Sequence, residues 1–145
     1  MREILFRGKR RDNGDWIYWD MLGHITTHTG KISKYTQKTK YGESYYYYAY
    51  QLWNRIDHST IGQYTGLKDK NGKRIFEGDV VVLPGRSLPR WYHEGQHVVV
   101  EYDGSGFVPL CEYDSDCGDF VIAGECEIIG NVHDNPELMR GDGNG

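Results

Sequence analysis

Short runs that alternate apolar and polar residues, separated by glycine-containing turns, extend through most of the 145-residue chain. The clearest is the segment 61–83, IGQYTGLKDKNGKRIFEGDVVVL. Its apolar residues are mainly β-branched or aromatic, and Asn71-Gly72 permits the positive φ of a tight hairpin turn. Glu77-Gly78-Asp79 predicts a second sharp corner, where the Asp79 carboxylate binds nearby backbone N–H groups. We therefore expect two strands before this corner and a buried strand, Val80–Leu83, after it.

The same alternation predicts strands on both sides of this segment. The expected strands are 4–7, 16–22, 96–102, 107–110, 120–123 and 126–130, with an edge hairpin or loop at 24–40. Asn135 as an N-cap and Pro136 at the first helical position predict one short helix to about residue 140, before a disordered tail, 141–145. The polar connection 55–60 divides the chain into an N-terminal β lobe, 1–60, and a second lobe, 61–140. The expected fold class is all-β with one short C-terminal helix.

A tyrosine-rich stretch, YGESYYYYAYQLW at 41–53, predicts a further strand. In a strand, Tyr46, Tyr48 and Tyr50 would share one face. One interpretation is a platform on which single-stranded bases stack. The other is aromatic packing between layers or at a subunit interface, where tyrosine is enriched. The three tyrosines are therefore candidate partner-binding residues.

Charge is segregated along the chain. Residues 1–93 hold 16 Lys+Arg against 9 Asp+Glu, whereas residues 94–145 hold one Arg against 12 acids. Arg10 and Arg11 belong to a basic cluster at a predicted hairpin tip and are further candidates for partner binding. The segregation is consistent with two solvated surfaces, with head-to-tail self-association, or with a basic lobe that binds nucleic acid.

No combination of residues predicts catalysis or a cofactor. The pentapeptide His93-Glu94-Gly95-Gln96-His97 matches H-E-x-x-H, but the zinc motif needs a helix. Gly95 and the strand-forming Val98–Val100 predict a loop-to-strand junction instead, so we expect neither a metal site nor an enzyme. Three cysteines without C-x-x-C spacing predict reduced thiols, and no apolar run predicts a signal peptide or membrane span. We expect a soluble cytoplasmic protein.

The central segment GQYTGLKDKNGKRIFEGDVV resembles the signature of the YopX family, small proteins of bacteriophages and prophages. EIIGNVHDNPELM at 127–139 and ILFRGKRRDNGDWIYWDML at 4–22 match it as well. The resemblance implies a mostly β fold whose second lobe is similar to an SH3-like barrel, and it implies no activity. We therefore expect a non-catalytic phage or prophage module that forms a homo-oligomer and binds a partner. The alternative is a nucleic-acid-binding protein that uses the basic N-terminal lobe and the tyrosine strand.

Overall fold

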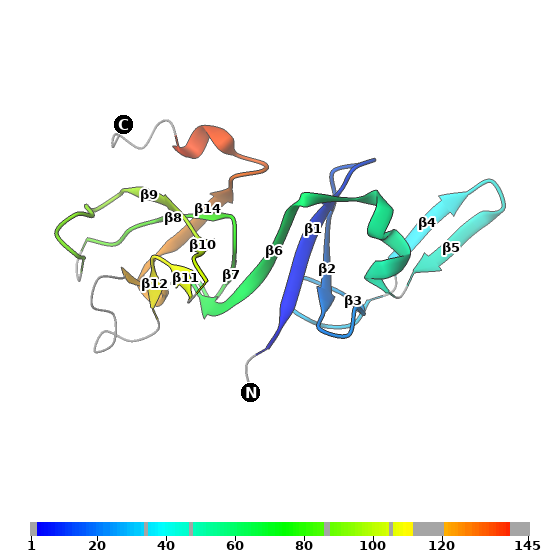
Figure 1. Cartoon of the computed structure of the whole chain (residues 1–145), viewed down its shortest axis with the longest axis horizontal. Helices are drawn as coiled ribbons and strands as arrows, with labels where there is room; N and C mark the ends of the chain where they lie inside the picture. Colours follow the sequence, from blue (N-terminus) through cyan, green and yellow to red (C-terminus); the bar gives the residue numbers. More distant parts are fainter. Residues whose placement is uncertain are drawn as a thin grey trace. The chain divides into compact units, whose positions relative to one another are not determined.

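The computed structural model describes residues 3–33, 35–46, 48–85, 88–104, 106–111 and 121–139, with the backbone alone for 35–39 and 44–46. The chain divides into two compact units, Met1–Gln63 and Tyr64–Gly145. The long strand Ile56–Lys68 (β6) is continuous through the point of division (Figure 1). Residues 55–60, expected to form a polar connection, include the start of this strand.

The first unit is built on an antiparallel sheet in the order β3-β2-β1-β6. Its other strands are β1 (Leu5–Arg10), β2 (Trp16–Asp20) and β3 (Ile25–Thr26). Ile17, Trp19, Ile25, Ala49, Leu52 and Ile56 form its buried core. Gly8 of β1 lies so close to this core that a Cβ atom there would be 2.8 Å from Cγ2 of Ile56. Any residue larger than glycine at position 8 would therefore have to displace core side chains.

The tyrosine-rich stretch divides into two elements. Strand β5 (Gly42–Tyr46) pairs with β4 (Tyr35–Thr39) in a hairpin, and a 3₁₀-helix, η1 (Ala49–Arg55), follows it (Figure 1). The expectation of one strand reaching residue 53 is therefore wrong. Ala49 and Leu52 stand three residues apart, so in a 3₁₀-helix both face the same side, and both are buried. Burial of this pair outweighs the β propensity of the neighbouring tyrosines.

The second unit contains the remaining strands in small sheets. Its principal sheet has the order β14-β8-β9, formed by β8 (Asp79–Val82), β9 (His97–Val99) and β14 (Glu127–Asn131). The second half of β6 pairs with β7 (Arg74–Phe76). The short strands are β10 (Glu101–Tyr102), β11 (Phe107–Val108), β12 (Leu110–Cys111) and β13 (Val121–Ile122), with 3₁₀ turns η3 (Ala123–Glu125) and η4 (Pro136–Met139).

The all-β class is confirmed, and the short C-terminal helix is the 3₁₀ turn η4, which begins at Pro136 as expected. The sheets do not join into a closed barrel within the described residues, so the SH3-like barrel is not confirmed. The part of the chain that the structure describes contains no helix long and apolar enough to cross a membrane. The acidic loop 112–119 and the tail 141–145 lie outside the described residues.

Two aspartates shape the corners of the second unit, and the sequence predicts this role for Asp79. The backbone N–H of Phe76 donates to Oδ2 of Asp79 at 2.8 Å, which closes the corner before β8. Asp69, also buried, accepts from the backbone N–H groups of Asn71 and Lys73, both at 2.9 Å, and from that of Ile128 at 3.0 Å. One carboxylate thus holds the hairpin turn and joins it to β14.

The cysteines differ from the expectation of reduced thiols. Cys111 is disulfide-bonded, so that expectation is wrong for it. Cys126 is free and buried in the core of the second unit. Burial raises the pKa of its thiol to about 12, with smaller contributions from the nearby Glu125 and Asp69 carboxylates.

Candidate interaction surface

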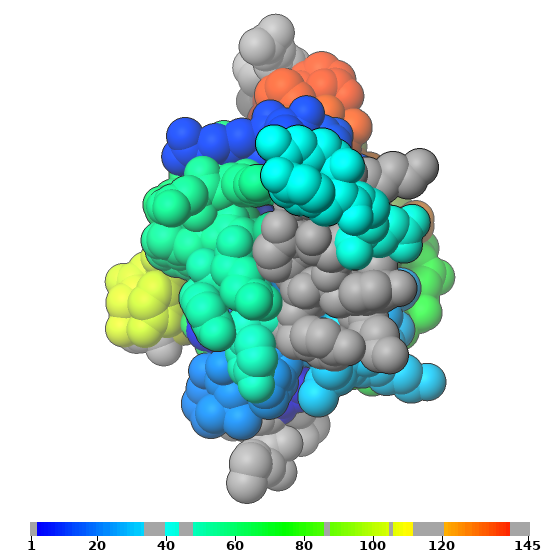
Figure 2. Space-filling model, turned by 90° about the vertical axis from the view of Figure 1, so that its right-hand side faces the viewer, coloured from blue at the N-terminus to red at the C-terminus, as the bar shows by residue number. Residues whose placement is uncertain are grey.

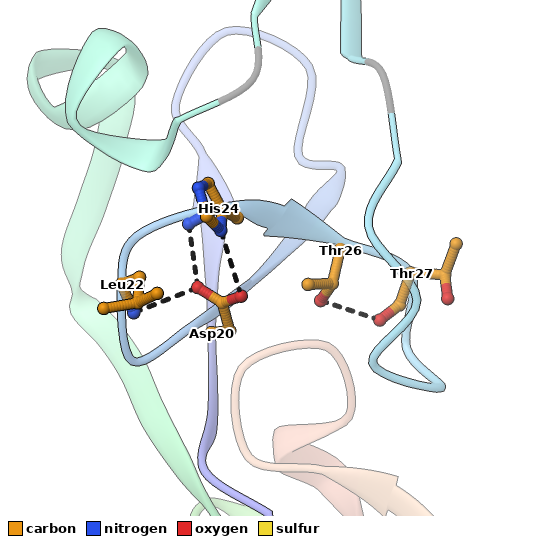
Figure 3. Close-up of polar contacts among 5 residues, drawn as sticks. All are labelled: Asp20, Leu22, His24, Thr26 and Thr27. Atoms are coloured by element: carbon orange, nitrogen blue, oxygen red, sulfur yellow. Dashed lines mark hydrogen bonds and ion pairs between the residues drawn. The ribbon is translucent and has the colours of Figure 1, made fainter.

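The turn that follows β2 is organised by the carboxylate of Asp20 (Figure 3). Its Oδ1 accepts hydrogen bonds from the backbone N–H groups of Leu22, at 3.0 Å, and His24, at 2.9 Å. Its Oδ2 lies 3.4 Å from Nδ1 of His24. Gly23 has a φ of 84°, a left-handed conformation that glycine adopts without strain. These bonds hold a tight turn whose tip, Met21 and Leu22, is 67% and 72% exposed.

The start of η1 packs directly on this turn. The backbone N–H of Ala49 donates to the carbonyl of Gly23 at 2.7 Å, and His24 forms an isolated β-bridge with Tyr48. The His24 and Tyr48 rings have centroids 4.8 Å apart, and Tyr48 and Tyr50 follow at 5.4 Å. Figure 2 shows the green-cyan segment of η1 and the blue turn after β2 side by side on one face. Two segments distant in sequence thus form one surface.

Five exposed side chains make up what we call the aromatic surface: Met21, Leu22, Tyr48, Tyr50 and Trp53. The three aromatic residues are 36%, 71% and 44% exposed. At about 200 Å² per aromatic side chain they leave about 300 Å² accessible, before the Met and Leu side chains are added. An exposed apolar area of this size is comparable with the largest apolar patch on a typical monomeric protein, which is often functional.

Trp53 is fixed at the far end of the aromatic surface by His58. The two rings have centroids 4.3 Å apart, and a ring nitrogen of His58, Nε2, lies 2.9 Å from the carbonyl oxygen of Trp53. The exposed indole is therefore held by neighbours on the same unit and does not need a partner to be ordered. Ordered aromatic side chains lose little conformational entropy when they bind, which suits them to interfaces.

The candidate residues from the sequence have different positions. Tyr48 and Tyr50 lie on the aromatic surface, whereas the side chain of Tyr46 lies outside the described part. Arg10 is buried and ion-paired with Asp12, so its guanidinium is not presented at the surface. Arg11 is exposed, and its Nε donates to the carbonyl of Ile56 at 3.2 Å.

Arg7, which belongs to the same basic cluster as Arg10 and lies in β1, is also buried. Its guanidinium carbon lies 4.4 Å from the centroid of the Trp16 ring, a cation–π contact. Two of the four cations of the basic cluster 7–11 are therefore part of the unit's internal packing. The cluster presents a smaller positive surface than the sequence indicates.

Three residues of the aromatic surface were not singled out by sequence reasoning: Met21, Leu22 and Trp53. The expected strand 16–22 included the first two, but β2 ends at Asp20 and leaves them in the turn. One signal in the sequence indicated that Met21 and Leu22 are exposed in a turn. They lie between Asp20 and Gly23, and aspartate and glycine are both typical turn residues. The position of Trp53 depends on η1, which the sequence did not predict.

The H-E-x-x-H match has no helix. Gly95 has a φ of 81° within a turn, and His97 begins β9, with its Nδ1 2.6 Å from the carbonyl oxygen of Leu138. Among the described residues, no three His, Cys, Asp or Glu side chains are placed to hold a metal ion. An open cavity of about 440 Å³ in the second unit is lined by Lys70, Pro84, Gly85, Gly124 and Glu125, which include no nucleophile with an adjacent base.

Fold and surface together define an all-β protein of two units with an exposed aromatic surface on the first. A family model described as YopX protein matches residues 5–140, and the chain belongs to the YopX family. The crystal structure of protein EF1440 from Enterococcus faecalis is similar, with a TM-score of 0.50 and 21% sequence identity. The match covers 94% of this chain and 97% of that chain, and at this identity it concerns the fold alone. No curated protein matches the chain.

Proposed function

We propose that this protein is a non-catalytic β module, encoded by a phage or prophage, which associates with copies of itself through the aromatic surface. The assembled protein then binds a partner. One observation carries the proposal: the turn with the exposed Met21 and Leu22 is bonded directly to the start of η1, where Tyr48, Tyr50 and Trp53 are exposed as well. Family membership is consistent with the proposal and assigns no activity to the chain.

The composition of the aromatic surface suits a protein–protein contact. Tyrosine, tryptophan and methionine are enriched in interfaces, and charged residues are depleted from interface cores. None of the five residues is charged. The carboxylate of Asp20, in the same turn as Met21 and Leu22, accepts hydrogen bonds from that turn, so burying the aromatic surface would not leave it as an isolated charge.

Nucleic-acid binding is the second candidate, because the exposed rings of Tyr48 and Tyr50 offer stacking faces and Arg55 is exposed at the end of η1. Two observations favour a protein partner over it. The burial of Arg7 and Arg10 removes cations that would contact phosphates. Met21 and Leu22, which contribute much of the exposed area, have no ring on which a base could stack.

The proposal is tested by light scattering after size exclusion, at low and high salt, with and without a single-stranded oligonucleotide. We expect the mass of the wild type to be a discrete multiple of the 16.8 kDa chain and to stay the same when the oligonucleotide is added. Tyr50→Ser should shift the protein toward the monomer, whereas Tyr41→Ser, at the tip of the β4–β5 hairpin, should not. A wild-type monomer that gains mass only with oligonucleotide, and loses it in salt, would establish the second candidate instead.

A further inference from the structure

The second unit carries its own exposed aromatic feature, a turn formed by Pro89, Arg90, Trp91 and Tyr92. The backbone N–H of Tyr92 donates to the carbonyl of Pro89 at 3.0 Å, which places Arg90 and Trp91 at the two central positions. Trp91 is 54% exposed and Arg90 is exposed as well. We call these four residues the Trp91 tip.

The Trp91 tip is anchored to the unit on which it stands. Tyr92 and Leu88 pack against the core of the second unit, which fixes the tip from within. Backbone bonds join Leu83 to Gln96 at 2.9 Å and to Gly95 at 3.1 Å at the base of the loop. The buried Gln96 side chain accepts from the backbone N–H of His93 at 3.1 Å. The backbone that carries Trp91 is therefore held in place before binding, which lowers the entropy lost on association.

The two units carry opposite net charge. Residues 1–63 contain 10 Lys+Arg and 6 Asp+Glu, whereas residues 64–145 contain 7 Lys+Arg and 15 Asp+Glu. A two-fold contact between two aromatic surfaces would bring two positively charged units together. A contact between the first unit of one copy and the second unit of another would join opposite charges, which favours association.

We propose that the Trp91 tip of one copy docks on the aromatic surface of another copy, so that the contact is heterologous. This proposal rests on the self-association proposed above, and it identifies the Trp91 tip as the surface that contacts the aromatic surface of the next copy. Tryptophan and arginine are the residue types that most often dominate interface energies. The Arg90 guanidinium can stack on the exposed rings of Tyr50 or Trp53 while Trp91 covers the aliphatic Met21–Leu22 tip. Each copy then has one donor and one acceptor surface, and the discrete mass expected above corresponds to closure of this contact into a ring.

Two single substitutions and their mixture test the arrangement. Tyr50→Ser removes part of the acceptor and leaves the Trp91 tip intact, whereas Trp91→Ser removes the donor and leaves the aromatic surface intact. Each variant alone should associate about 30-fold more weakly than the wild type, as expected for a central interface residue. Mixed in equal amounts, the two should form a dimer, because the intact tip of the first variant docks on the intact surface of the second. Light scattering measures all three masses.

Matched controls keep the outcomes distinct. Tyr102→Ser removes an aromatic residue of the same unit with nearly the same exposure, 55%, and should keep the wild-type mass. Leu22→Ser is a second acceptor variant for use if Tyr50→Ser fails to fold, as judged by its thermal transition.

The outcomes separate the two proposals. A wild type that is monomeric overturns the proposed self-association. A wild-type oligomer that Trp91→Ser leaves unchanged overturns the heterologous contact alone, as does a mixture of two monomeric variants that stays monomeric. Recovery of a dimer on mixing supports the heterologous contact.

Discussion

The imidazole of His24 lies against the ring of Tyr48, with centroids 4.8 Å apart, and the backbones of the two residues form a β-bridge. His24 belongs to the turn after β2, and Tyr48 is the residue that precedes η1. The contact therefore joins the two segments that make up the aromatic surface. A change that loosens either segment should alter the whole surface.

Asp20 should be the residue on which the shape of this turn depends. Asp20→Ala removes the acceptor of two backbone N–H groups, so we expect the free energy of unfolding to fall by about 1–2 kcal/mol. Self-association should weaken as well, because Met21 and Leu22 lose their fixed position. Urea denaturation and light scattering measure the two effects.

Asp20→Asn is the matched control, because both backbone bonds go to Oδ1, which the amide oxygen can replace. The substitution removes only the charge that faces His24 across 3.4 Å. It should remain close to the wild type in stability. A loss as large as that of the alanine variant would assign the effect to the ion pair and contradict the role given to the backbone bonds.

Gly8→Ala should strongly destabilise the first unit. Its Cβ would lie 2.8 Å from Cγ2 of Ile56 and 3.3 Å from the Trp19 ring, both in the buried core. Overpacking of this kind costs about 1–3 kcal/mol. Gly106→Ala is the comparison, since its backbone is not left-handed and no atom lies within 4 Å of the added Cβ. Thermal unfolding should separate the two variants clearly, and equal melting temperatures would be inconsistent with this packing.

Asp69→Ala should be among the most damaging substitutions in the second unit. The change leaves the N–H groups of Asn71, Lys73 and Ile128 without their acceptor, which we expect to lower the free energy of unfolding by about 3 kcal/mol. Asp103 also accepts a turn N–H, that of Gly106, but on the exposed surface. Asp103→Ala should therefore unfold at nearly the wild-type urea concentration. A small effect of Asp69→Ala would show that the hairpin and β14 hold together without the carboxylate.

The Cys126 thiol should be unreactive in the folded protein. With its pKa raised from 9.0 to about 12, it stays protonated through neutral pH, and the thiolate is the reactive form. A thiol reagent at pH 8 should label the folded wild type and Cys126→Ala equally, and label one more thiol in the wild type after unfolding.

The raised pKa of Cys126 also makes the free energy of unfolding depend on pH. Below pH 9 the thiol is protonated in both states, whereas between about pH 9 and 12 only the unfolded state loses its proton. The stability contribution of Cys126 is therefore complete below pH 9 and falls as the pH rises toward 12. The difference in unfolding free energy between the wild type and Cys126→Ala should follow this course, and a constant difference across the range would contradict it.

The sequence predicted those features that depend on neighbouring residues. The Asp79 corner and the Asn71-Gly72 turn are confirmed because their geometry follows from local backbone preferences. The family resemblance is confirmed because its motifs extend through both units. The SH3-like barrel is not confirmed, since it depends on which strands pair over long distances.

The aromatic surface could not be predicted for a similar reason. It requires the turn that ends β2 to meet the start of η1, and nothing local to either segment specifies that contact. The tyrosine run also favoured a strand by its residue types, whereas the buried pair Ala49 and Leu52 favours the 3₁₀-helix. Arg7 and Arg10 were expected in solvent because arginine is usually exposed, but stacking on Trp16 and pairing with Asp12 place them inside the unit.

The hydrogen bond from Ile128 to Asp69 joins residues that are 59 positions apart in the chain. Strand β8 likewise pairs with β14, which is synthesised much later. The partner strands of the first unit, in contrast, are all present once residue 63 has been made. On the ribosome the first unit can therefore complete its sheet while most of the second is still unsynthesised. A nascent chain that stops before β14 would carry a finished first unit and an apolar β8 that is paired only with β9, so one edge of β8 would be open. Such a chain should be prone to aggregation and degradation.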